Sequence, residues 1–416
     1  MTATIKVPEG EFLAMHDGRV EPATQPIIGY VEGDGIGPDI TRACLRVWDA
    51  AVRSVYGTKR RVAWCELFMG EKATHLFDGN PFPDETLAAI RKLKVAIKGP
   101  LGTPVGTGIR SLNVALRQKL DLYACIRPVR YYKGVPSPMK QPDKLDIVIF
   151  RENTEDVYAG IEYASGSPEN QRLAHFLRRE MQATFFEEAG LGVKPMSPFA
   201  SKRLVRKAIR YALDYGRKSV TLVHKGNIMK FTEGAFRTWG YEVARDEFAE
   251  VTVTEEQVNK ECGGQVPDGK VVIKDRIADI MFQLLLLRPD EFDVLATPNL
   301  NGDYLSDAAA AQVGGVGIAP GANIGDEAAV FEATHGTAPK YANQDKVNPG
   351  SLLLSGADMF EFIGWHEVSA LLRDAYEKTV QDKIVTYDFA RQMEGATEVA
   401  TSAFAEAVIE RMSAGA

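Results

Sequence analysis

The sequence predicts an α/β protein, because short apolar runs of strand length alternate along the chain with segments of helical periodicity. Two further observations agree with this fold class. The 416 residues are 45% hydrophobic, enough to bury a large core and form two domains, or one domain with an insertion. No internal repeat or low-complexity segment interrupts the alternation.

Six apolar runs have the length and composition of buried strands. They are Ile27–Val31, Val95–Lys98, Asp146–Phe150, Ser219–Val223, Val271–Lys274 and Asp293–Thr297. Helical patterns lie between them at Asp84–Leu93, Lys202–Tyr215 and Asp275–Leu287. Ser111 is the expected N-cap of a further helix that ends near Leu120.

Residues 161–200 break this alternation. They contain a Ser-Gly-Ser-Pro piece and a charged turn at Leu177–Glu180, and they show no clean strand period. We therefore expect an insertion that packs outside the main core, against another subunit. The stretch Val251–Lys270 allows no interpretation from sequence.

Composition excludes several classes of protein. The net charge of -7 argues against a nucleic-acid-coating protein. The most apolar stretch, Met281–Leu287, is far shorter than the roughly 20 residues of a transmembrane helix, and no signal peptide is visible, so a cytoplasmic protein is expected. Four scattered cysteines without a CxxC pair indicate reduced, buried thiols and no zinc site.

Two glycine-containing loops are candidates for ligand contacts, but neither identifies the ligand. Gly33–Pro38 follows a predicted strand, but its glycine spacing differs from GxGxxG, and no P-loop motif occurs in the chain. It predicts a tight turn that brings backbone close to a neighbour. The second loop, His335–Tyr341, combines a histidine, a glycine and a lysine and suits contacts with adenine and phosphate.

Asp303 and Asp307 are the most informative pair of residues. If Gly302 ends a loop and a helix follows, the two carboxylates lie one turn apart on one face, where like charges repel. Both would be stabilised by the helix dipole in a first turn, or by a divalent cation bridging them. From the pair alone, both interpretations stay open.

Arginines at the ends of predicted elements indicate an acidic ligand. Arg117 lies in the predicted helix, while Arg127, Arg130 and Arg151 lie in or next to apolar strands, where a charge is not simply solvated. Several guanidiniums around one cleft would hold carboxylates by bidentate hydrogen bonds. Together with the aspartates, they predict a small acidic substrate that chelates a metal ion.

Five longer motifs make the chain recognisable. They are Tyr30–Gly37, Gly106–Asn113, Phe150–Tyr158, Val223–Asn227 and Asn299–Ile318. Along essentially its whole length, the chain resembles the β-decarboxylating dehydrogenases of the isocitrate/isopropylmalate dehydrogenase family. The resemblance implies a non-Rossmann α/β fold with a large domain (residues 1–122 and 314–416), a small domain (123–155 and 198–313) and a clasp (156–197). In this family the clasp interlocks two subunits in a homodimer.

The resemblance also implies the substrate site. Ser111 and Asn113 match residues that hold the distal carboxylate of isocitrate, and being polar they favour isocitrate over isopropylmalate. Arg117, Arg127 and Arg151 match residues that clamp the other two carboxylates. The implied reaction is oxidative decarboxylation of isocitrate with NADP, a step of the tricarboxylic acid cycle. Some bacterial members are regulated at the matching serine, which suggests a kinase acting on Ser111.

Metal ligands and catalytic groups follow by the same resemblance. Asp303 and Asp307 match ligands of Mg²⁺ or Mn²⁺, joined by Asp279 of the partner subunit. Lys225, also contributed by the partner subunit, would accept the proton of the substrate hydroxyl. Tyr158 would protonate the enol carbon after CO₂ leaves.

The cofactor implied by the resemblance is NADP. The matching residues are Thr103, Arg288 of the partner subunit, His335, Gly336, Thr337, Lys340, Tyr341, Asn348, Tyr387 and Arg391. NAD-using relatives typically carry an aspartate at the position of Lys340, where it would repel the 2′-phosphate. One departure is Gly102, where close relatives carry a threonine near the nicotinamide.

Two alternatives stay open. The first is a related enzyme that acts on homoisocitrate, tartrate or isopropylmalate. The second is a regulatory subunit without catalytic activity. The presence of Tyr158, Lys225, Asp279, Asp303 and Asp307 speaks against a regulatory subunit.

Overall fold

The computed structural model describes residues 4–16, 18–102 and 111–413, and it confirms the α/β class. One mixed sheet of eleven strands runs through the molecule in the order β11-β12-β10-β13-β7-β6-β14-β15-β5-β3-β4. Its strands are β3 (Ile27–Val31), β4 (Ala63–Glu66), β5 (Val95–Lys98), β6 (Ala124–Arg130), β7 (Asp146–Glu152), β10 (Ser219–His224), β11 (Thr252–Thr254), β12 (Val271–Ile277), β13 (Val294–Thr297), β14 (Pro320–Ile324) and β15 (Ala329–Ala333).

Most neighbouring strands in this sheet are parallel, and the exceptions lie at its middle. Strand β6 is antiparallel to both β7 and β14, and β14 is antiparallel to β15. The strands from β11 to β6 come from the middle of the chain, whereas those from β14 to β4 come from its two ends. The domain boundaries at residues 122, 155, 197 and 313 stay a prediction.

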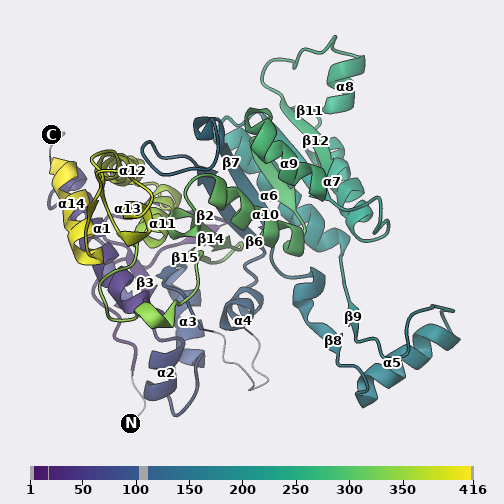
Figure 1. Cartoon of the computed structure of the whole chain (residues 1–416), viewed down its shortest axis with the longest axis horizontal. Helices are drawn as coiled ribbons and strands as arrows, with labels where there is room; N and C mark the ends of the chain where they lie inside the picture. The colour runs from purple at the N-terminus through teal and green to yellow at the C-terminus, as the bar shows by residue number, and fades with distance from the viewer. Residues whose placement is uncertain (1–3, 17, 103–110, 414–416) are drawn as a thin grey trace.

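Helices cover both halves of the sheet (Figure 1). They are α1 (Gly37–Tyr56), α2 (Glu71–Leu76), α3 (Asp84–Leu93), α4 (Leu112–Lys119), α5 (Pro168–Arg179), α6 (Pro198–Asp214), α7 (Glu233–Glu247), α8 (Glu255–Lys260), α9 (Ala278–Leu287), α10 (Asn299–Gln312), α11 (Gly350–Phe362), α12 (His366–Gln381), α13 (Tyr387–Ala390) and α14 (Thr401–Ser413). Short 3-10 turns are η1 (Pro142–Lys144), η2 (Asp156–Ala159), η3 (Pro289–Glu291), η4 (Val316–Ile318) and η5 (Pro339–Tyr341). None of the described helices is long and apolar enough to cross a membrane.

The predicted strands and helices are all present in the structure, with bounds that differ from the prediction by up to four residues. Strands β3 and β5 and helix α3 have the predicted bounds. The helix predicted to begin at Asp275 instead begins at Ala278, because Asp275 to Ile277 continue β12 alongside the last residues of β10. The uninterpreted stretch 251–270 contributes the edge strand β11 and the helix α8, which begins with a capping box of Thr254 and Gln257.

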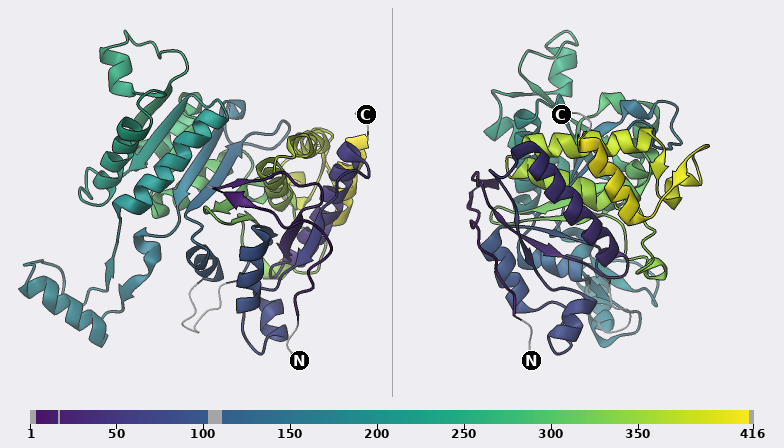
Figure 2. Two further views of the ribbon diagram at one scale, coloured as in Figure 1. Left: turned by 180° about the vertical axis from the view of Figure 1, so that it is seen from behind. Right: turned by 90° about the vertical axis from the view of Figure 1, so that its left-hand side faces the viewer.

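The insertion is an arm that projects from the body (Figures 1 and 2). It holds α5 and a small antiparallel sheet of β8 (Ile161–Tyr163) and β9 (Leu191–Val193). The predicted position outside the main core is confirmed, and the stretch without a clean strand period contains two short strands. Three residues per strand are too few for a visible alternation.

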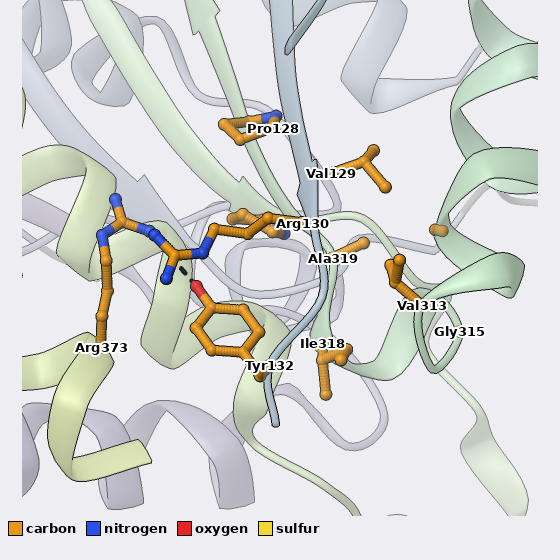
Figure 3. Close-up of a pocket in the computed structure, with 11 residues that line it drawn as sticks. Pro128, Val129, Arg130, Tyr132, Val313, Gly315, Ile318, Ala319 and Arg373 are labelled. Atoms are coloured by element: carbon orange, nitrogen blue, oxygen red, sulfur yellow. Dashed lines mark hydrogen bonds between the residues drawn. The ribbon is translucent and has the colours of Figure 1, made fainter. Parts of the chain in front are cut away.

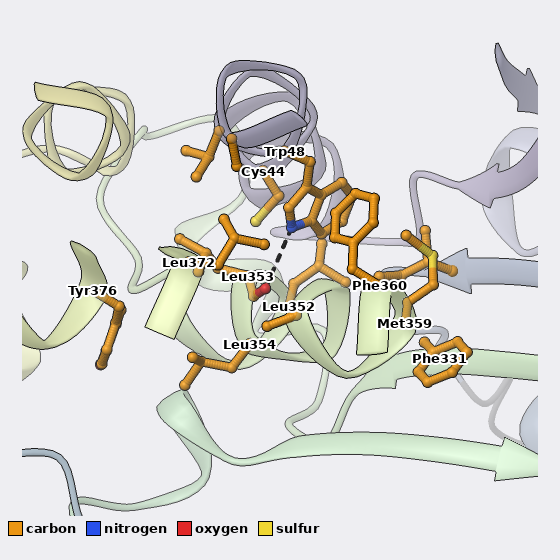
Figure 4. Close-up of a cluster of buried hydrophobic side chains, with 14 of the residues drawn as sticks. Cys44, Trp48, Phe331, Leu352, Leu353, Leu354, Met359, Phe360, Leu372 and Tyr376 are labelled. Atoms are coloured by element: carbon orange, nitrogen blue, oxygen red, sulfur yellow. Dashed lines mark hydrogen bonds between the residues drawn. The ribbon is translucent and has the colours of Figure 1, made fainter. Parts of the chain in front are cut away.

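A dense apolar core lies under α1, α11 and α12. Figure 4 shows Trp48 of α1 donating from Nε1 to the Leu353 carbonyl of α11 at 3.3 Å, with Phe360 beside it. This bond satisfies a buried indole N–H. The four cysteines, all in the described residues, form no disulfide; Cys44, Cys65 and Cys125 are buried as predicted, and Cys262 is partly exposed.

Two small sheets complete the fold. One pairs β1 (Met15–His16) with β2 (Arg19–Val20), and the other pairs β16 (Ile384–Val385) with β17 (Thr397–Glu398). The β1–β2 segment lies against α6, because Arg19 donates to Asp214 Oδ2 at 2.7 Å. This hydrogen bond therefore connects the N-terminal segment to helix α6, which comes from the middle of the chain.

Candidate active site

Two buried arginines on neighbouring strands form the centre of the candidate site. Arg127 lies in β6 and Arg151 in β7, and in their antiparallel register Cys125 faces Arg151. Because side chains alternate along a strand, both arginines point to one face of the sheet. Arg151 is 1% exposed and Arg127 8% exposed, so their guanidiniums require polar partners other than bulk water. The prediction that Arg151 follows its strand is wrong, since β7 continues through Glu152.

The acidic residues of the site come from α10, which begins at Asn299 soon after β13. Asp303 and Asp307 lie one turn apart on this helix, as predicted. Arg151 forms an ion pair with Asp303. Arg127 donates from Nη1 to Asp307 Oδ1 at 3.2 Å. Each carboxylate is therefore anchored by one of the two strand arginines.

Gly302 does not end a loop as predicted, because it lies inside α10. A Cβ atom at this position would lie 2.6 Å from Cβ of Arg151 and 2.3 Å from Oγ1 of Thr297, so only glycine allows the helix to approach the strand. The first turn of α10, which is fully described, holds no acidic residue. The helix dipole therefore does not explain the aspartate pair.

Tyr158 joins this group from η2. Its hydroxyl donates to Asp303 Oδ2 at 2.8 Å, and Cζ of Arg151 lies 4.8 Å from its ring centroid. Burial raises the pKa of the Tyr158 phenol, against the charge of Arg151. Burial also acts on Asp303, but Arg151 and the Tyr158 hydrogen bond outweigh it and lower the pKa of Asp303. Burial raises the pKa of Asp307, opposed by Arg127 and reinforced by the charge of Asp303.

A buried ion-pair network that sequence analysis missed supports the site from β5 and β15. Glu332 is 4% exposed and pairs with Lys98 at 2.8 Å and with Arg117 at 3.0 Å. Burial alone would raise the pKa of Glu332, but the charges of Lys98 and Arg117 hold it well below its usual range. In the sequence, the only sign of this network is one charged residue at or near the end of each of two apolar strands. The parallel register of β5 and β15 places Lys98 opposite Glu332.

Several buried polar atoms around these arginines have no hydrogen-bond partner among the described residues. They are Nε of Arg117, Nε of Arg127 and Oδ1 of Asn113. Ser111 is the N-cap residue of α4 as predicted, but its side chain makes no capping hydrogen bond. Buried polar atoms of native proteins are nearly always hydrogen-bonded, so the two guanidinium N–H groups fit an anionic ligand, whereas the Asn113 oxygen requires a donor.

Lys225 and Asp279 form a separate pair. Lys225 Nζ donates to Asp279 Oδ1 at 2.5 Å, and this hydrogen bond lowers the pKa of the Asp279 carboxyl. Neither side chain bonds to Tyr158, Asp303 or Asp307 among the described residues. One chain therefore assembles the predicted site in two parts, and sharing between subunits stays a prediction.

The donor set fits a divalent cation only when a second subunit is counted. No group of three His, Cys, Asp or Glu side chains that would hold a metal ion occurs in the described residues of one chain. Asp303 and Asp307 offer two carboxylates, which are hard oxygen ligands suited to Mg²⁺ or Mn²⁺. Their side chains are 35% and 59% exposed, so both are open to further ligands.

Loops with glycine and aromatic residues form the predicted cofactor region. Gly35 has a positive φ of 59°, and a Cβ there would lie 2.2 Å from the Thr337 carbonyl oxygen, so the two glycine-containing loops meet. Ile36 donates its N–H to that same oxygen at 3.0 Å. Burial lowers the pKa of His335, whose Nδ1 lies 3.0 Å from the Gly336 carbonyl oxygen.

Cationic and phenolic side chains gather beside this loop. Nζ of Lys340 lies 4.8 Å from the ring centroid of Tyr341, whose ring lies 5.5 Å from that of Tyr387. Cζ of Arg391 lies 6.0 Å from the Tyr387 ring. A hydrogen bond with Lys340 and its charge lower the pKa of Tyr341. Four predicted residues from two segments are therefore together.

The remaining predicted cofactor residues do not all lie in this group. Asn348 is 6% exposed and donates to Asp388 at 3.0 Å, close in sequence to Tyr387. Arg288 follows α9, and its ion pair is with Glu291 at 3.4 Å, so it is not assembled with the others in one chain. Thr103 lies outside the described residues.

Comparisons with known proteins show the family of this chain. The family profile of the isocitrate/isopropylmalate dehydrogenases matches residues 27–408. A protein of Archaeoglobus fulgidus named isocitrate dehydrogenase [NADP] is 58% identical, and the match covers 98% of each chain. A protein of the same name from Pseudomonas aeruginosa is 57% identical over 93% of each chain.

A solved structure supports the same assignment. The crystal structure of isocitrate dehydrogenase from Methylococcus capsulatus superposes with a TM-score of 0.76 at 36% identity, covering 93% of this chain and 99% of that one. The fold and the paired aspartates beside arginines define a dehydrogenase of the β-decarboxylating type. The chain belongs to the isocitrate/isopropylmalate dehydrogenase family.

Proposed function

We propose that this chain is an NADP-dependent enzyme that oxidises and decarboxylates isocitrate to 2-oxoglutarate and CO₂. The observation that carries the proposal is the cluster of Arg127, Arg151, Asp303, Asp307 and Tyr158 on one face of the sheet. The two arginines there would bind substrate carboxylates. The two aspartates would bind a metal ion, and the tyrosine hydroxyl would transfer a proton. The names of the relatives support the substrate and the cofactor.

Three arginines are the proposed clamp for two of the substrate carboxylates. Arg117, Arg127 and Arg151 are all less than a tenth exposed, and Nε of two of them lacks a partner among the described residues. A guanidinium binds a carboxylate through two parallel hydrogen bonds. Ser111 and Asn113, at the start of α4, are the proposed contacts of the third carboxylate.

Asp303 and Asp307, with Asp279 of the partner subunit, are the proposed ligands of Mg²⁺ or Mn²⁺. A bound divalent ion supplies Lewis acidity that makes the substrate hydroxyl easier to deprotonate and stabilises the charge left when CO₂ departs. Arg127 and Arg151 keep the two aspartates in place. The lowered pKa of Asp303 keeps that carboxyl ionised at neutral pH.

Proton transfer is assigned to Lys225 of the partner subunit and to Tyr158. We assign to the lysine Nζ the acceptance of the hydroxyl proton of isocitrate. We assign to the Tyr158 hydroxyl the delivery of a proton to the carbon that has lost CO₂. Its raised pKa keeps this hydroxyl protonated at neutral pH, as a proton donor requires.

NADP supplies the hydride acceptor when bound. The proposed contacts are Lys340 and Tyr341 with Tyr387 and Arg391 for the 2′-phosphate. A phosphate with about 1.5 to 2 negative charges requires such donors. His335, Gly336, Thr337 and Asn348 are the proposed contacts of the adenine side, with Thr103 near the nicotinamide and Arg288 from the partner subunit.

A homodimer is the proposed assembly. The arm exposes Phe186 at 91% and Met181 at 64%, and Leu287 at the end of α9 is 72% exposed. Large exposed apolar side chains such as these, on the arm and at the end of α9, are typical of protein–protein interfaces. A second subunit that covered them would also bring Lys225 and Asp279 to the other chain's aspartate pair.

The test is NADPH formation by the purified full-length protein. We expect turnover of isocitrate with Mg²⁺ or Mn²⁺, loss of turnover with EDTA, and much lower kcat/KM with homoisocitrate, tartrate and isopropylmalate. Equal or higher kcat/KM for one of those acids would change the substrate assignment. Absence of turnover with any of them would favour a regulatory subunit.

A further inference from the structure

The face of the sheet opposite the candidate active site carries a second large cleft. Along β6, Ile126, Pro128 and Arg130 alternate with Arg127, and along β7, Val148 and Phe150 alternate with Arg151. The residues Ile126, Pro128, Arg130, Val148 and Phe150 line a cleft of about 1160 Å³. Since alternate side chains point to opposite faces, this cleft lies behind the arginine clamp. Its volume would hold a small molecule of substrate or nucleotide size.

Two helical layers form further parts of the cleft lining. Helix α6 contributes Lys207, Arg210 and Tyr211, and helices α11 and α12 contribute Asp358 and Arg373. Burial raises the pKa of Tyr211, which lines the cleft together with Asp358 and Arg373. The cleft therefore lies between elements from separate parts of the chain.

The cleft carries an excess of positive charge. Eight Arg and Lys side chains line it, against five Asp and Glu side chains, although the chain as a whole has a net charge of -7. Some of these cations are paired. Arg203 forms two hydrogen bonds with Asp121 at 2.7 and 2.8 Å, and Arg217 pairs with Asp146 at 2.9 Å.

Three cations of the lining have no carboxylate partner among the described residues. Among the described residues, Nζ of Lys207 donates only to the Gly325 carbonyl oxygen, at 3.3 Å, and Arg210 forms no hydrogen bond or ion pair there. Arg130 packs on the ring of Tyr132, with Cζ 4.9 Å from the centroid. Figure 3 shows its guanidinium beside that of Arg373, whose own carboxylate partner is Asp358.

The surroundings of Lys207 show that its charge is not compensated. Burial, with smaller contributions from Arg210 and Arg203, lowers the pKa of its amine to about 8, and the charge of Asp326 opposes this only in part. Its Nζ also lies 5.0 Å from the ring centroid of Tyr123, which is a weak substitute for an anion. A bound anion would supply the missing partner.

We infer that this cleft holds a binding site for a small polyanion at Lys207 and Arg210 of α6, next to Tyr123, whereas Arg130 lies at the other end of β6 and outside this site. The ligand carries at least two negative charges on phosphate or carboxylate oxygens, since these are the groups that lysine and arginine bind best. The site is separate from the proposed reaction, because it lies on the other face of β6 and β7.

The test is calorimetric titration of the full-length protein, free of divalent metal, at about 0.15 M salt to screen weak surface binding. Sodium pyrophosphate and propane-1,2,3-tricarboxylate are the two probes, one for each source of anionic oxygens. The variants are Lys207→Met with Arg210→Met, and Arg210→Glu alone, which alters an exposed residue. The matched control is Arg53→Met with Lys59→Met, which removes the same charges from exposed positions of α1 and the following turn.

We expect the wild-type and control proteins to bind one of the probes with equal Kd, and both α6 variants to weaken that Kd at least tenfold. The probe that binds identifies the oxygen chemistry. Anion binding in the reaction site contributes equally to all proteins, so the titrations are fitted with two sites and only the site that differs between the α6 variants and the control is assigned to the cleft. The inference is overturned if neither probe distinguishes the α6 variants from wild type, or if the control loses as much affinity. Turnover of isocitrate, assayed separately, decides the proposed function independently.

Discussion

Lys225 and Asp279 are hydrogen-bonded to one another at 2.5 Å, and neither contacts Tyr158 in the described parts of the same chain. Both are predicted to act in one active site with Tyr158. This arrangement is explained if Lys225 and Asp279 complete the site of a second subunit. The prediction from this relationship is complementation between inactive chains.

Lys225→Met and Tyr158→Phe homodimers should each have little activity, because each lacks one proton-transfer group in both sites. Mixed under conditions that exchange subunits, they should recover up to about half of the wild-type activity per heterodimer, because one site regains both groups. The measurement is NADPH formation before and after exchange. Heterodimers verified by differential tags that stay inactive would count against shared sites.

Asp303→Asn should reduce kcat by about two or more orders of magnitude, because it removes a proposed metal ligand while keeping the shape of the side chain. The variant should remain folded and should require more Mn²⁺ for its residual activity. Asp290→Asn is the matched control, since it alters an exposed aspartate of η3 that pairs with Lys144 at 3.2 Å. Full activity of the Asp303 variant in EDTA would remove the metal assignment.

Ser111→Asp should inactivate the enzyme, because a negative charge would occupy the place proposed for a substrate carboxylate. Two buried polar atoms close by in sequence, Asn113 Oδ1 and Arg117 Nε, have no hydrogen-bond partner among the described residues. Ser111→Ala serves as the control and should keep measurable kcat/KM for isocitrate. Near-normal kcat/KM of the aspartate variant would show that Ser111 does not line the substrate site.

Much of this fold was predictable from sequence because its strands are buried and its turns carry clear signals. Val95–Lys98 and Ile27–Val31 are short apolar runs and their bounds were correct. The boundary of α9 was wrong because Asp275 to Ile277 read equally as helix, and only pairing with β10 makes them a strand.

The candidate site was less predictable, because its contacts join residues far apart in sequence. The pairing of Arg151 with Asp303 depends on β7 and α10 packing through Gly302, which no local pattern shows. Glu332 was missed for the same reason, since a single charge in an apolar strand becomes informative only when its partners Lys98 and Arg117 are known. Most of the named site residues came from resemblance to a family, not from spacing.

Glu332→Gln should lower the free energy of unfolding by about 3 to 5 kcal/mol at pH 7, because it leaves Lys98 and Arg117 buried with less compensation. The pKa of Glu332 is depressed in the folded protein, so its stabilising contribution is present above its unfolded pKa of about 4.3 and is lost as the pH falls toward the folded value. The variant should therefore show a weaker loss of stability than wild type below about pH 4.3. Urea unfolding at pH 7 and at about pH 3 measures this, and Glu394→Gln, at an exposed position, is the control. A parallel loss in all three proteins would contradict the role of Glu332.

Replacing Lys340 by Asp and Tyr341 by Ile should weaken NADP binding far more than NAD binding. The two side chains lie next to Tyr387, and Nζ of Lys340 is 4.8 Å from the Tyr341 ring centroid, so together they form a cationic and phenolic surface for a phosphate. An aspartate in place of the lysine exchanges a charged hydrogen bond for repulsion, which should cost about 3 kcal/mol or more in NADP affinity. NAD lacks the 2′-phosphate, so its Kd should change little. The measurement is kcat/KM for both cofactors in wild type, in this double variant and in Lys59→Asp, an exposed control. Equal kcat/KM of the wild-type enzyme for NADP and NAD would contradict the assignment of this surface.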